Sequence, residues 1–554
     1  MKKQGFLYGS AVLIISALIV KVIGALFRIP LANMLGGTGM GYFSAAYGIF
    51  MPVYAVSVTG LPVAAARAVS AAAAKGRQDE AEAVKRTALS LFGGVGAVGT
   101  LIIILGAYPL CRFVSGDISA VPAVIAIAPT VLAGCLVSVY RGCAEGMRDM
   151  YPTAVSQVIE GAAKLVFGLS LCYGCLYIAN NASLLFLRLT GCIRLGISAE
   201  DAVLPYASAA AVLGITLSSF AGLLYMILRD KREKNHRTDR LSPKDRAEIR
   251  KELLRTAIPA AVGALVINLT SLIDLVTVMR SLRSLISSSP WVFSELLGSG
   301  IPYAEMPNYI YGSFTGLAVT VFNLVPSITN MFGKSMLPAA AAAKTSGDIK
   351  HLGECSGGAV LAAAIASVPA GLGIAVLAEP VLKTLFGGRE LEISVCVSSM
   401  RVLGAAVPFV CISSAAFAVL QAADRADIPV KLMAVGAAVK LLGNIILTPV
   451  PKLGVTGAAI STLLCYIFIC AASLHMLKKY AAFGAKDFFY INFRIFSCGL
   501  LCAAGAFFVY SFLSDYGNTV ISTAVACLSG AIIYIISTYF SGIITKSTLK
   551  MLIS

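Results

Sequence analysis

The sequence contains few charged residues. Asp, Glu, Lys and Arg together make up 13% of the 554 residues, whereas they make up about 25% of a typical soluble globular protein. Hydrophobic residues account for 58%, and the mean hydropathy is +0.85. This composition excludes soluble enzymes, disordered chains and collagen-like repeats, and it favours a polytopic membrane protein.

Motifs that would indicate catalysis or ATP hydrolysis are also missing. The sequence has no GxxxxGK[ST] phosphate-binding loop, and its only three histidines are not arranged with Ser and Asp as in a hydrolase. The fourteen cysteines are scattered through apolar segments, and the Cys172/Cys175 pair has no second pair to complete a zinc site. We therefore expect no enzyme activity, no metal and no resident cofactor, with the cysteines serving as small core residues.

Long hydrophobic runs are abundant. They lack the alternation over segments of about ten residues that marks an outer-membrane β-barrel, so we expect helices. A helix needs about 20 apolar residues to cross a bilayer. Fourteen such segments lie near residues 6–32, 42–64, 87–110, 120–141, 152–177, 203–228, 253–279, 309–332, 355–378, 394–420, 428–448, 455–477, 493–513 and 517–541. The predicted fold class is an all-α polytopic membrane protein with about 14 transmembrane helices.

The net charge of +17 has a distinct distribution along the chain. If the N-terminus is cytoplasmic, thirty of the 44 Lys and Arg fall in cytoplasmic loops or at the two ends, eight in the outer loops and six within helices. Membrane proteins show this excess of basic residues on their cytoplasmic side. We therefore expect both termini to be cytoplasmic, and we attribute the basic charge to topology and not to nucleic-acid binding.

Two parts of the chain resemble each other at a constant offset of nearly half its length. The sequence LPVAAARA at Leu61 recurs as LPAAAAAK at Leu337, and GAAKL at Gly161 recurs at the same offset as AAVKL at Ala437. A shift of six helices preserves their direction, which predicts parallel repeats. The expected organisation is two pseudo-symmetric six-helix lobes plus two C-terminal helices. Its parts are an N-lobe at 1–228, a basic cytoplasmic linker at 229–252, a C-lobe at 253–478 and the two last helices with the tail at 479–554.

Ionisable residues within the predicted helices are candidates for function, because a charge inside a bilayer is expensive unless it faces a cavity or a partner. Most of those without a carboxylate nearby are basic, which suits an anionic substrate such as a phosphate or pyrophosphate. We predict a central substrate cavity lined by Lys21, Arg28, Glu160, Lys164, Asp274 and Lys440.

Some of these residues have a structural interpretation as well. Glu160 and Lys164 are four residues apart and can pair within their own helix. Arg28 and Arg255 can extend from helix ends to lipid headgroups. An ion that drives transport, Na+ or H+, would use polar groups on helices 7 and 11, and the membrane potential is the other energy source. The candidate ion-coupling residues are Asn268, Asp274, Asn444 and Thr448.

The first two predicted helices carry a family likeness. The segment KVIGALFRIPL at Lys21, then LGG at Leu35, GMGYFSAAY at Gly39 and TGLP at Thr59 resemble the polysaccharide-export and SpoVB (stage V sporulation protein B) branch of the MOP (multidrug/oligosaccharidyl-lipid/polysaccharide) exporter superfamily. The superfamily also contains the MurJ lipid II flippases. The resemblance extends over the whole length, because two six-helix lobes with two additional helices fit that branch.

The resemblance implies a V-shaped flippase that works by alternating access and moves a polyprenyl-pyrophosphate-linked oligosaccharide, such as the peptidoglycan precursor lipid II, across the membrane. MurJ-type relatives place basic residues of helix 1 in the central cavity, and Lys21 and Arg28 match those positions. They also carry arginine late in helix 2 and in helix 8, where this chain has no basic residue in 53–61 or before Lys334. The last two predicted helices lie outside the repeat and contain almost no charge, which makes them candidates for the groove of the lipid tail.

Two rival functions are weighed against a flippase. A cation-coupled multidrug antiporter of the same superfamily would need more carboxylates within its helices. A non-transporting scaffold of cell-wall or spore-coat assembly would have no reason to retain buried charges.

The expected partners are the lipid-linked oligosaccharide and the lipid bilayer, with cell-wall synthesis enzymes as candidate protein partners of a monomer. The expected location is the bacterial cytoplasmic membrane.

Overall fold

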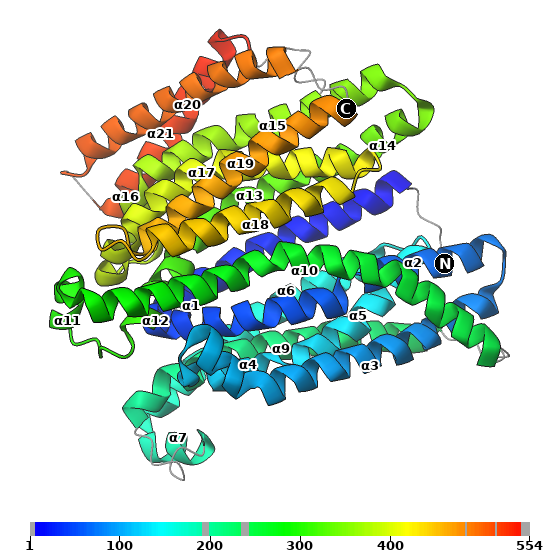
Figure 1. The fold of residues 1–554 in the computed structure, drawn as a ribbon, viewed down its shortest axis with the longest axis horizontal. Coiled ribbons are helices and arrows are strands. Elements are labelled where there is room, and N and C mark those ends of the chain that lie inside the picture. Colours follow the sequence, from blue (N-terminus) through cyan, green and yellow to red (C-terminus); the bar gives the residue numbers. More distant parts are fainter. Residues whose placement is uncertain (1–5, 191–198, 234–242, 482–484, 516–517, 544–554) are drawn as a thin grey trace. The chain divides into compact units, whose positions relative to one another are not determined.

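The computed structural model describes residues 6–190, 199–233, 243–481, 485–515 and 518–543. Within these residues the chain forms helices and turns and no strand (Figure 1). The α-helices are α1 (Phe6–Val58), α2 (Leu61–Ala74), α3 (Gln78–Leu110), α4 (Val121–Ile127), α5 (Pro129–Gly146), α6 (Tyr151–Asn181), α7 (Ser183–Thr190), α9 (Ala199–Glu233), α10 (Pro243–Ser288), α11 (Ser294–Gly298), α12 (Met306–Ser313), α13 (Val319–Ser335), α14 (Leu337–Ser346), α15 (Ile349–Val376), α16 (Ala378–Leu385), α17 (Glu390–Ala422), α18 (Asp427–Leu447), α19 (Val455–Tyr480), α20 (Ala485–Leu513) and α21 (Thr519–Phe540).

The 53 residues of α1 form two helices joined by a reversal of the chain. The joint is Gly36, whose φ of 62° and ψ of −171° are accessible mainly to glycine. In a straight helix Phe27 and Phe43 would be about 24 Å apart, yet their ring centroids are 6.5 Å apart. The chain therefore folds back at Gly36, and α1 is a helical hairpin.

The described residues contain thirteen helical segments that are long and apolar enough to cross a membrane. The first of them, Val12–Ala74, is 63 residues long and contains the Gly36 hairpin, so it makes two of the predicted crossings. The other twelve each contain or overlap one predicted segment. The all-α polytopic fold predicted from the hydrophobic runs is confirmed.

The contacts divide the chain into two compact units, Met1–Val276 and Thr277–Ser554, so that the boundary falls within α10. In the first unit, α6 and α9 pack most closely at glycines. A Cβ added to Gly214 would lie 2.4 Å from the Cα of Gly168, and one added to Gly168 would lie 2.5 Å from the Phe27 ring. Small residues allow helix backbones to approach in a membrane. These two glycines therefore set the packing of α6 against α9 and α1.

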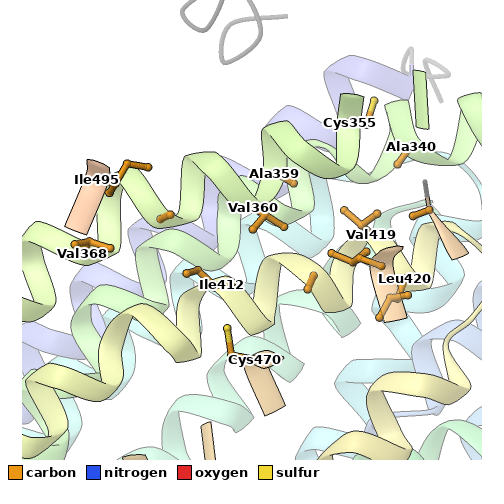
Figure 2. Close-up of a cluster of buried hydrophobic side chains, with 14 of the residues drawn as sticks. Ala340, Cys355, Ala359, Val360, Val368, Ile412, Val419, Leu420, Cys470 and Ile495 are labelled. Carbon is orange, nitrogen blue, oxygen red and sulfur yellow. The ribbon is translucent and has the colours of Figure 1, made fainter. Parts of the chain in front are cut away.

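The second unit has its core between α15, α17 and α19. Figure 2 shows part of a buried cluster that includes Val360 of α15, Ile412 and Val419 of α17 and Cys470 of α19. The C-terminal helices α20 and α21 join the same unit, because the Tyr534 hydroxyl donates to the Ile365 carbonyl of α15 at 2.9 Å. Their remaining faces carry exposed large hydrophobic side chains, as a lipid-facing helix does.

The predicted repeat is visible in the helix boundaries. Helices α2 and α14 begin at Leu61 and Leu337, α5 and α17 end at Gly146 and Ala422, and α6 and α18 begin at Tyr151 and Asp427. The members of each pair are separated by the same offset as the two matching sequence segments. These three boundaries therefore recur in the second unit at one offset.

The predicted basic linker is mostly helical at its ends. Helix α9 continues to Glu233 and α10 begins at Pro243, so only 234–242 of the predicted segment 229–252 lie outside the described residues.

The cysteines are mainly core residues, as expected. Of the thirteen described, all are free thiols, eleven are buried, and Cys527 is exposed.

Candidate functional site

The predicted site residue Glu160 forms an ion pair between helices of the first unit. Its Oε2 accepts from Arg141 Nη2 of α5 at 2.8 Å, and its Oε1 accepts from the Ser219 hydroxyl of α9 at 3.1 Å. Arg141 also donates from Nε to the buried Ser156 hydroxyl at 2.8 Å. Glu160 therefore connects α6 to both α5 and α9, and its charge is balanced by Arg141.

Lys164 lies one turn further along α6 and contacts aromatic rings of α1. Its Nζ is 4.8 Å from the centroid of the Phe27 ring and 6.0 Å from that of Tyr47. An ammonium over an aromatic face is attracted by the ring quadrupole. The predicted alternative, a Glu160–Lys164 pair within α6, is not among the ion pairs of the described residues.

The second half of α1 carries a row of aromatic rings. Phe43 and Tyr47 have centroids 5.0 Å apart, Tyr47 and Phe50 6.1 Å apart, and Phe50 and Tyr54 4.9 Å apart. The spacings of four and three residues place these rings on one face of the helix. Lys164 contacts this row at Tyr47, which gives the first unit a cation beside a continuous row of rings.

The first half of α1 carries the two basic residues that the resemblance assigns to substrate. Lys21 is exposed and Arg28 is partly buried. This half of α1 packs along α6, because a Cβ on Gly161 would lie 3.6 Å from both Val20 and Ile23. The structure therefore brings the helix of Lys21 and Arg28 against the helix of Lys164.

The predicted residues of α18 belong to a buried polar cluster in the second unit. Lys440 is 8% exposed, and Asn444 and Thr448 are fully buried. Asn444 donates from Nδ2 to the Thr277 hydroxyl of α10 at 2.9 Å and accepts the hydroxyl of Ser461 of α19. The Thr448 hydroxyl is buried and has no hydrogen-bond partner within the part of the chain that the structure describes. Oxygens of this kind can coordinate a small cation.

Several predicted residues lie apart from these two clusters. Asn268 donates to the Ala264 carbonyl of its own helix at 2.8 Å, and Asp274 is partly buried three residues before Thr277. Arg255 and Arg401 are both exposed. No group of three or more His, Cys, Asp or Glu suited to a metal occurs among the described residues.

The site contains residues that the sequence did not predict. Arg141 stands at the end of the predicted segment 120–141 and is one of the thirty basic residues assigned to the cytoplasmic side. In the structure it lies within α5, in the candidate span Ile118–Gly146. Its partner Glu160 lies on the next helix, beyond the reach of any rule of spacing within one helix. Ser156, Ser219, Thr277 and Ser461 were missed for a related reason, because isolated Ser and Thr are ordinary in membrane helices.

The sequence was compared with family models and with curated proteins, and the matches agree with one another. Residues 6–200 match the family model described as "Polysaccharide biosynthesis protein". The chain is 22% identical over 561 residues to stage V sporulation protein B of Bacillus subtilis (strain 168), with 99% of this chain and 98% of that protein covered. It is 23% identical over 496 residues to the lipid II flippase MurJ of the same organism, with 87% and 84% covered.

Solved structures with a similar fold include two groups of transporter. The inward closed conformation of the lipid II flippase MurJ matches with a TM-score of 0.62 at 14% identity and covers 95% of this chain and 98% of its own. An inward-facing multidrug resistance MATE family transporter of the MOP superfamily matches with a TM-score of 0.61 at 16% identity, covering 85% and 98%. At these identities the likeness shows the fold.

Proposed function

We propose that the chain is a membrane transporter of the MOP superfamily, in its SpoVB and MurJ-like branch, and that it flips a polyprenyl-pyrophosphate-linked oligosaccharide. The cargo is the peptidoglycan precursor lipid II or another cell-envelope glycan, carried from the inner to the outer leaflet of the bacterial cytoplasmic membrane. Both termini are cytoplasmic in this proposal, and the transporter acts as a monomer.

The main support is the charge of the first unit. Its candidate carboxylate, Glu160, is neutralised by Arg141 at 2.8 Å, whereas Lys164 lies over aromatic rings and Lys21 and Arg28 belong to the helix packed against α6. The balance of these groups is positive, which suits a pyrophosphate. The partly buried Tyr47 ring beside this cation also suits the sugar or isoprenoid groups next to that pyrophosphate.

In the proposed cycle, the two units alternate between conformations that open to either side of the membrane. In the first unit the pyrophosphate is bound by Lys21, Arg28 and Lys164. The polyprenyl tail stays in the bilayer and lies along α20 and α21, whose outer faces are apolar, with Phe508 74% and Phe540 81% exposed. An apolar tail gains nothing by leaving lipid, so only the polar headgroup needs a protein-lined path.

Energy for the cycle would come from Na+ or H+, or from the membrane potential. We propose the cluster of Asn444, Thr448, Ser461 and Thr277 as the coupling site in the second unit, with Asn268 and Asp274 of α10 as further candidates. Support comes from the buried Thr448 hydroxyl and from the side-chain oxygens that surround Asn444. Each offers the hard oxygen ligands that alkali cations prefer.

The direct test is complementation in a bacterium depleted of its own lipid II flippase, with surface-exposed lipid II as the readout. Restored exposure would establish lipid II as a cargo. If the protein is present in the membrane and exposure is not restored, lipid II is excluded, and the assay is repeated with another polyprenyl-linked glycan. The Lys21→Ala/Arg28→Ala double variant, expressed at the same level, is the matched control.

A second candidate function is multidrug efflux driven by a cation. The observation that favours it is the fold shared with MATE transporters, at a TM-score of 0.61. The ion pair of Glu160 with Arg141 argues against it, because a cationic drug needs a carboxylate that is available to it. Drug accumulation in an efflux-deficient strain, with and without the protein, separates the two functions.

A further inference from the structure

Glu160 and Lys164 are arranged on α6 in the order and spacing that normally produce an ion pair. A Glu four residues before a Lys is the favourable orientation of such a pair. In the structure each residue is engaged elsewhere. Both carboxylate oxygens of Glu160 accept from groups of other helices, Arg141 at 2.8 Å and Ser219 at 3.1 Å.

Arg141 is fixed in a way that makes it the stronger competitor for Glu160. Its Nε donates to Ser156 at 2.8 Å while its Nη2 donates to Glu160, so two hydrogen bonds determine the direction of the guanidinium plane. The side chains of Arg141 and Glu160 are only 16% and 30% exposed, which limits screening by water. A planar, oriented guanidinium loses less freedom per hydrogen bond than a lysine does.

Because Glu160 is bound by Arg141, Lys164 has a different neighbour. Its ammonium lies over Phe27 and Tyr47 of α1 and not over a carboxylate. A ring face attracts the charge without using an acceptor atom for each of the three N–H donors. The Lys164 ammonium can therefore donate hydrogen bonds to an anionic ligand without first breaking an ion pair.

We propose that Arg141 is a positioning residue for substrate binding: by holding Glu160, it keeps Lys164 on the aromatic rings and available for the pyrophosphate of the cargo. This inference rests on the proposed function, since it takes the pyrophosphate as the ligand of Lys164. It adds a role for a residue that contacts the cargo site only through Glu160. If Arg141 is removed, Glu160 takes Lys164 as its partner and the anion site is lost.

The test uses the full-length protein in nanodiscs and a soluble polyprenyl pyrophosphate with a short isoprenoid chain as the probe. Four variants are compared with the wild type: Arg141→Gln, Lys164→Gln, Arg141→Gln/Lys164→Gln and Arg141→Gln/Glu160→Gln. We expect Arg141→Gln and Lys164→Gln each to weaken binding about tenfold, the loss of one charge-assisted interaction. The Arg141→Gln/Lys164→Gln variant should be no weaker than Lys164→Gln, and the Glu160→Gln change should restore binding to Arg141→Gln.

Additive losses in the double variant, or an Arg141→Gln/Glu160→Gln variant as weak as Arg141→Gln, would overturn the proposal, since a purely structural Arg141 acts independently of Lys164. The rescued variant contains no unbalanced carboxylate, so it remains informative if Arg141→Gln alone folds poorly. Thermal unfolding of each variant checks its fold.

A readout without ligand separates this inference from the proposed function. Lysines methylated with ¹³C give NMR signals, and the Lys164 signal is identified by its loss in Lys164→Gln. It should shift in Arg141→Gln and return in Arg141→Gln/Glu160→Gln. An unchanged signal overturns the positioning role. A shifted signal in a protein whose wild type does not bind the pyrophosphate probe contradicts the proposed cargo and, with it, the role of Lys164 in binding it.

Discussion

Arg148 and Asp424 occupy equivalent positions in the two units and have the same left-handed backbone conformation, with φ of 61° in both. They are the only described residues other than glycine with a positive φ. Each follows the last residues of a helix, α5 or α17, and precedes the first turn of the next. Their separation along the chain equals that between Leu61 and Leu337, so the turn is a repeated element of the fold.

The hydrogen bonds of the two turns also correspond. The amide of Asp149 donates to the Ala144 carbonyl at 3.0 Å, and the amide of Arg425 donates to the Leu420 carbonyl at 2.9 Å. Such six-to-one bonds close a helix at its C-terminus. In both units the chain therefore ends one helix and starts another through the same turn.

Each turn contacts a later helix of its own unit, and the type of interaction differs between the two units. Asp149 accepts from Arg229 of α9 at 2.7 Å, whereas Arg425, at the equivalent position, lies with its guanidinium 4.0 Å from the centroid of the Tyr480 ring of α19. An acid is thus replaced by a base and an ion pair by a cation–π contact. The two turns therefore have the same backbone geometry, although the side chains at this position carry opposite charges.

The left-handed turns predict stabilisation by glycine. A residue with a Cβ pays roughly 1–2 kcal/mol in this conformation, and part of that gain is lost to the freedom of glycine in the unfolded chain. We expect Arg148→Gly and Asp424→Gly each to raise the free energy of unfolding by about 0.5–1 kcal/mol. Thermal unfolding in detergent measures the change.

Lys75 provides the control for this prediction. It is also exposed and follows a helix, but its φ is −83°, so Lys75→Gly should lower stability slightly. Equal effects at Lys75 and at the two turn positions would show that backbone strain does not contribute at Arg148 and Asp424.

The contact between α6 and α9 predicts a steric effect of small substitutions. Gly214→Ala places a Cβ 2.4 Å from backbone atoms of Gly168, a distance at which one helix has to shift. We expect a loss of about 2–4 kcal/mol in the stability of the first unit, in the range of overpacked cores or beyond. Gly174→Ala, on α6 with no atom within 4 Å, should be neutral or stabilising; a similar loss at Gly174 would count against packing as the cause.

The basic residues of α1 predict a loss of transport without loss of fold. Lys21→Ala and Arg28→Ala should each reduce flipping about tenfold, and the double variant more, if both bind the pyrophosphate. The measurement is surface exposure of the lipid-linked glycan at matched protein levels. Arg401→Ala, which removes an exposed arginine of α17, serves as the charge control. Retained activity in the double variant would rule out a pyrophosphate clamp on α1.

A substitution of Thr448 should affect protein stability and the ion dependence of transport in different ways. Its hydroxyl is buried without a hydrogen-bond partner in the described part of the chain, so replacing it with the similarly shaped valine should raise stability by about 1 kcal/mol. If this hydroxyl is a cation ligand, the same Thr448→Val variant should lose the ion dependence of transport. Transport at varied Na+ and pH, combined with thermal unfolding, tests both parts. Higher stability with unchanged ion dependence would remove Thr448 from the coupling site.

The sequence predicted the crossings and the repeat because both depend on properties of neighbouring residues. A run of about twenty apolar residues needs a bilayer wherever it packs, and LPVAAARA and LPAAAAAK identify equivalent helices without reference to contacts. The reversal at Gly36 falls between the two predicted segments 6–32 and 42–64. Each of these features can be recognised in the sequence without knowing which helices are in contact.

The site could be predicted only in part, because its contacts join helices that are distant in sequence. Lys164 was singled out as an intramembrane charge, but its neighbour Phe27 comes from another helix. Asn444 was singled out too, whereas its partner Thr277 lies on α10, far earlier in the chain. Arg141 was missed because a charge near a predicted helix end looks like a loop residue until its partner Glu160 is seen.

The hairpin at Gly36 bears on how the protein is made. Unbent, the 53 residues of α1 would extend about 80 Å, far more than the roughly 30 Å of the hydrocarbon layer. The reversal allows both arms to enter the membrane together, with their free ends on one side. The segment around the reversal, 35–42, reads LGGTGMGY and contains no charge. Biosynthesis of the first two crossings therefore requires no charged loop to be carried through the lipid, and the orientation of all later helices can be set by the residues that flank the hairpin.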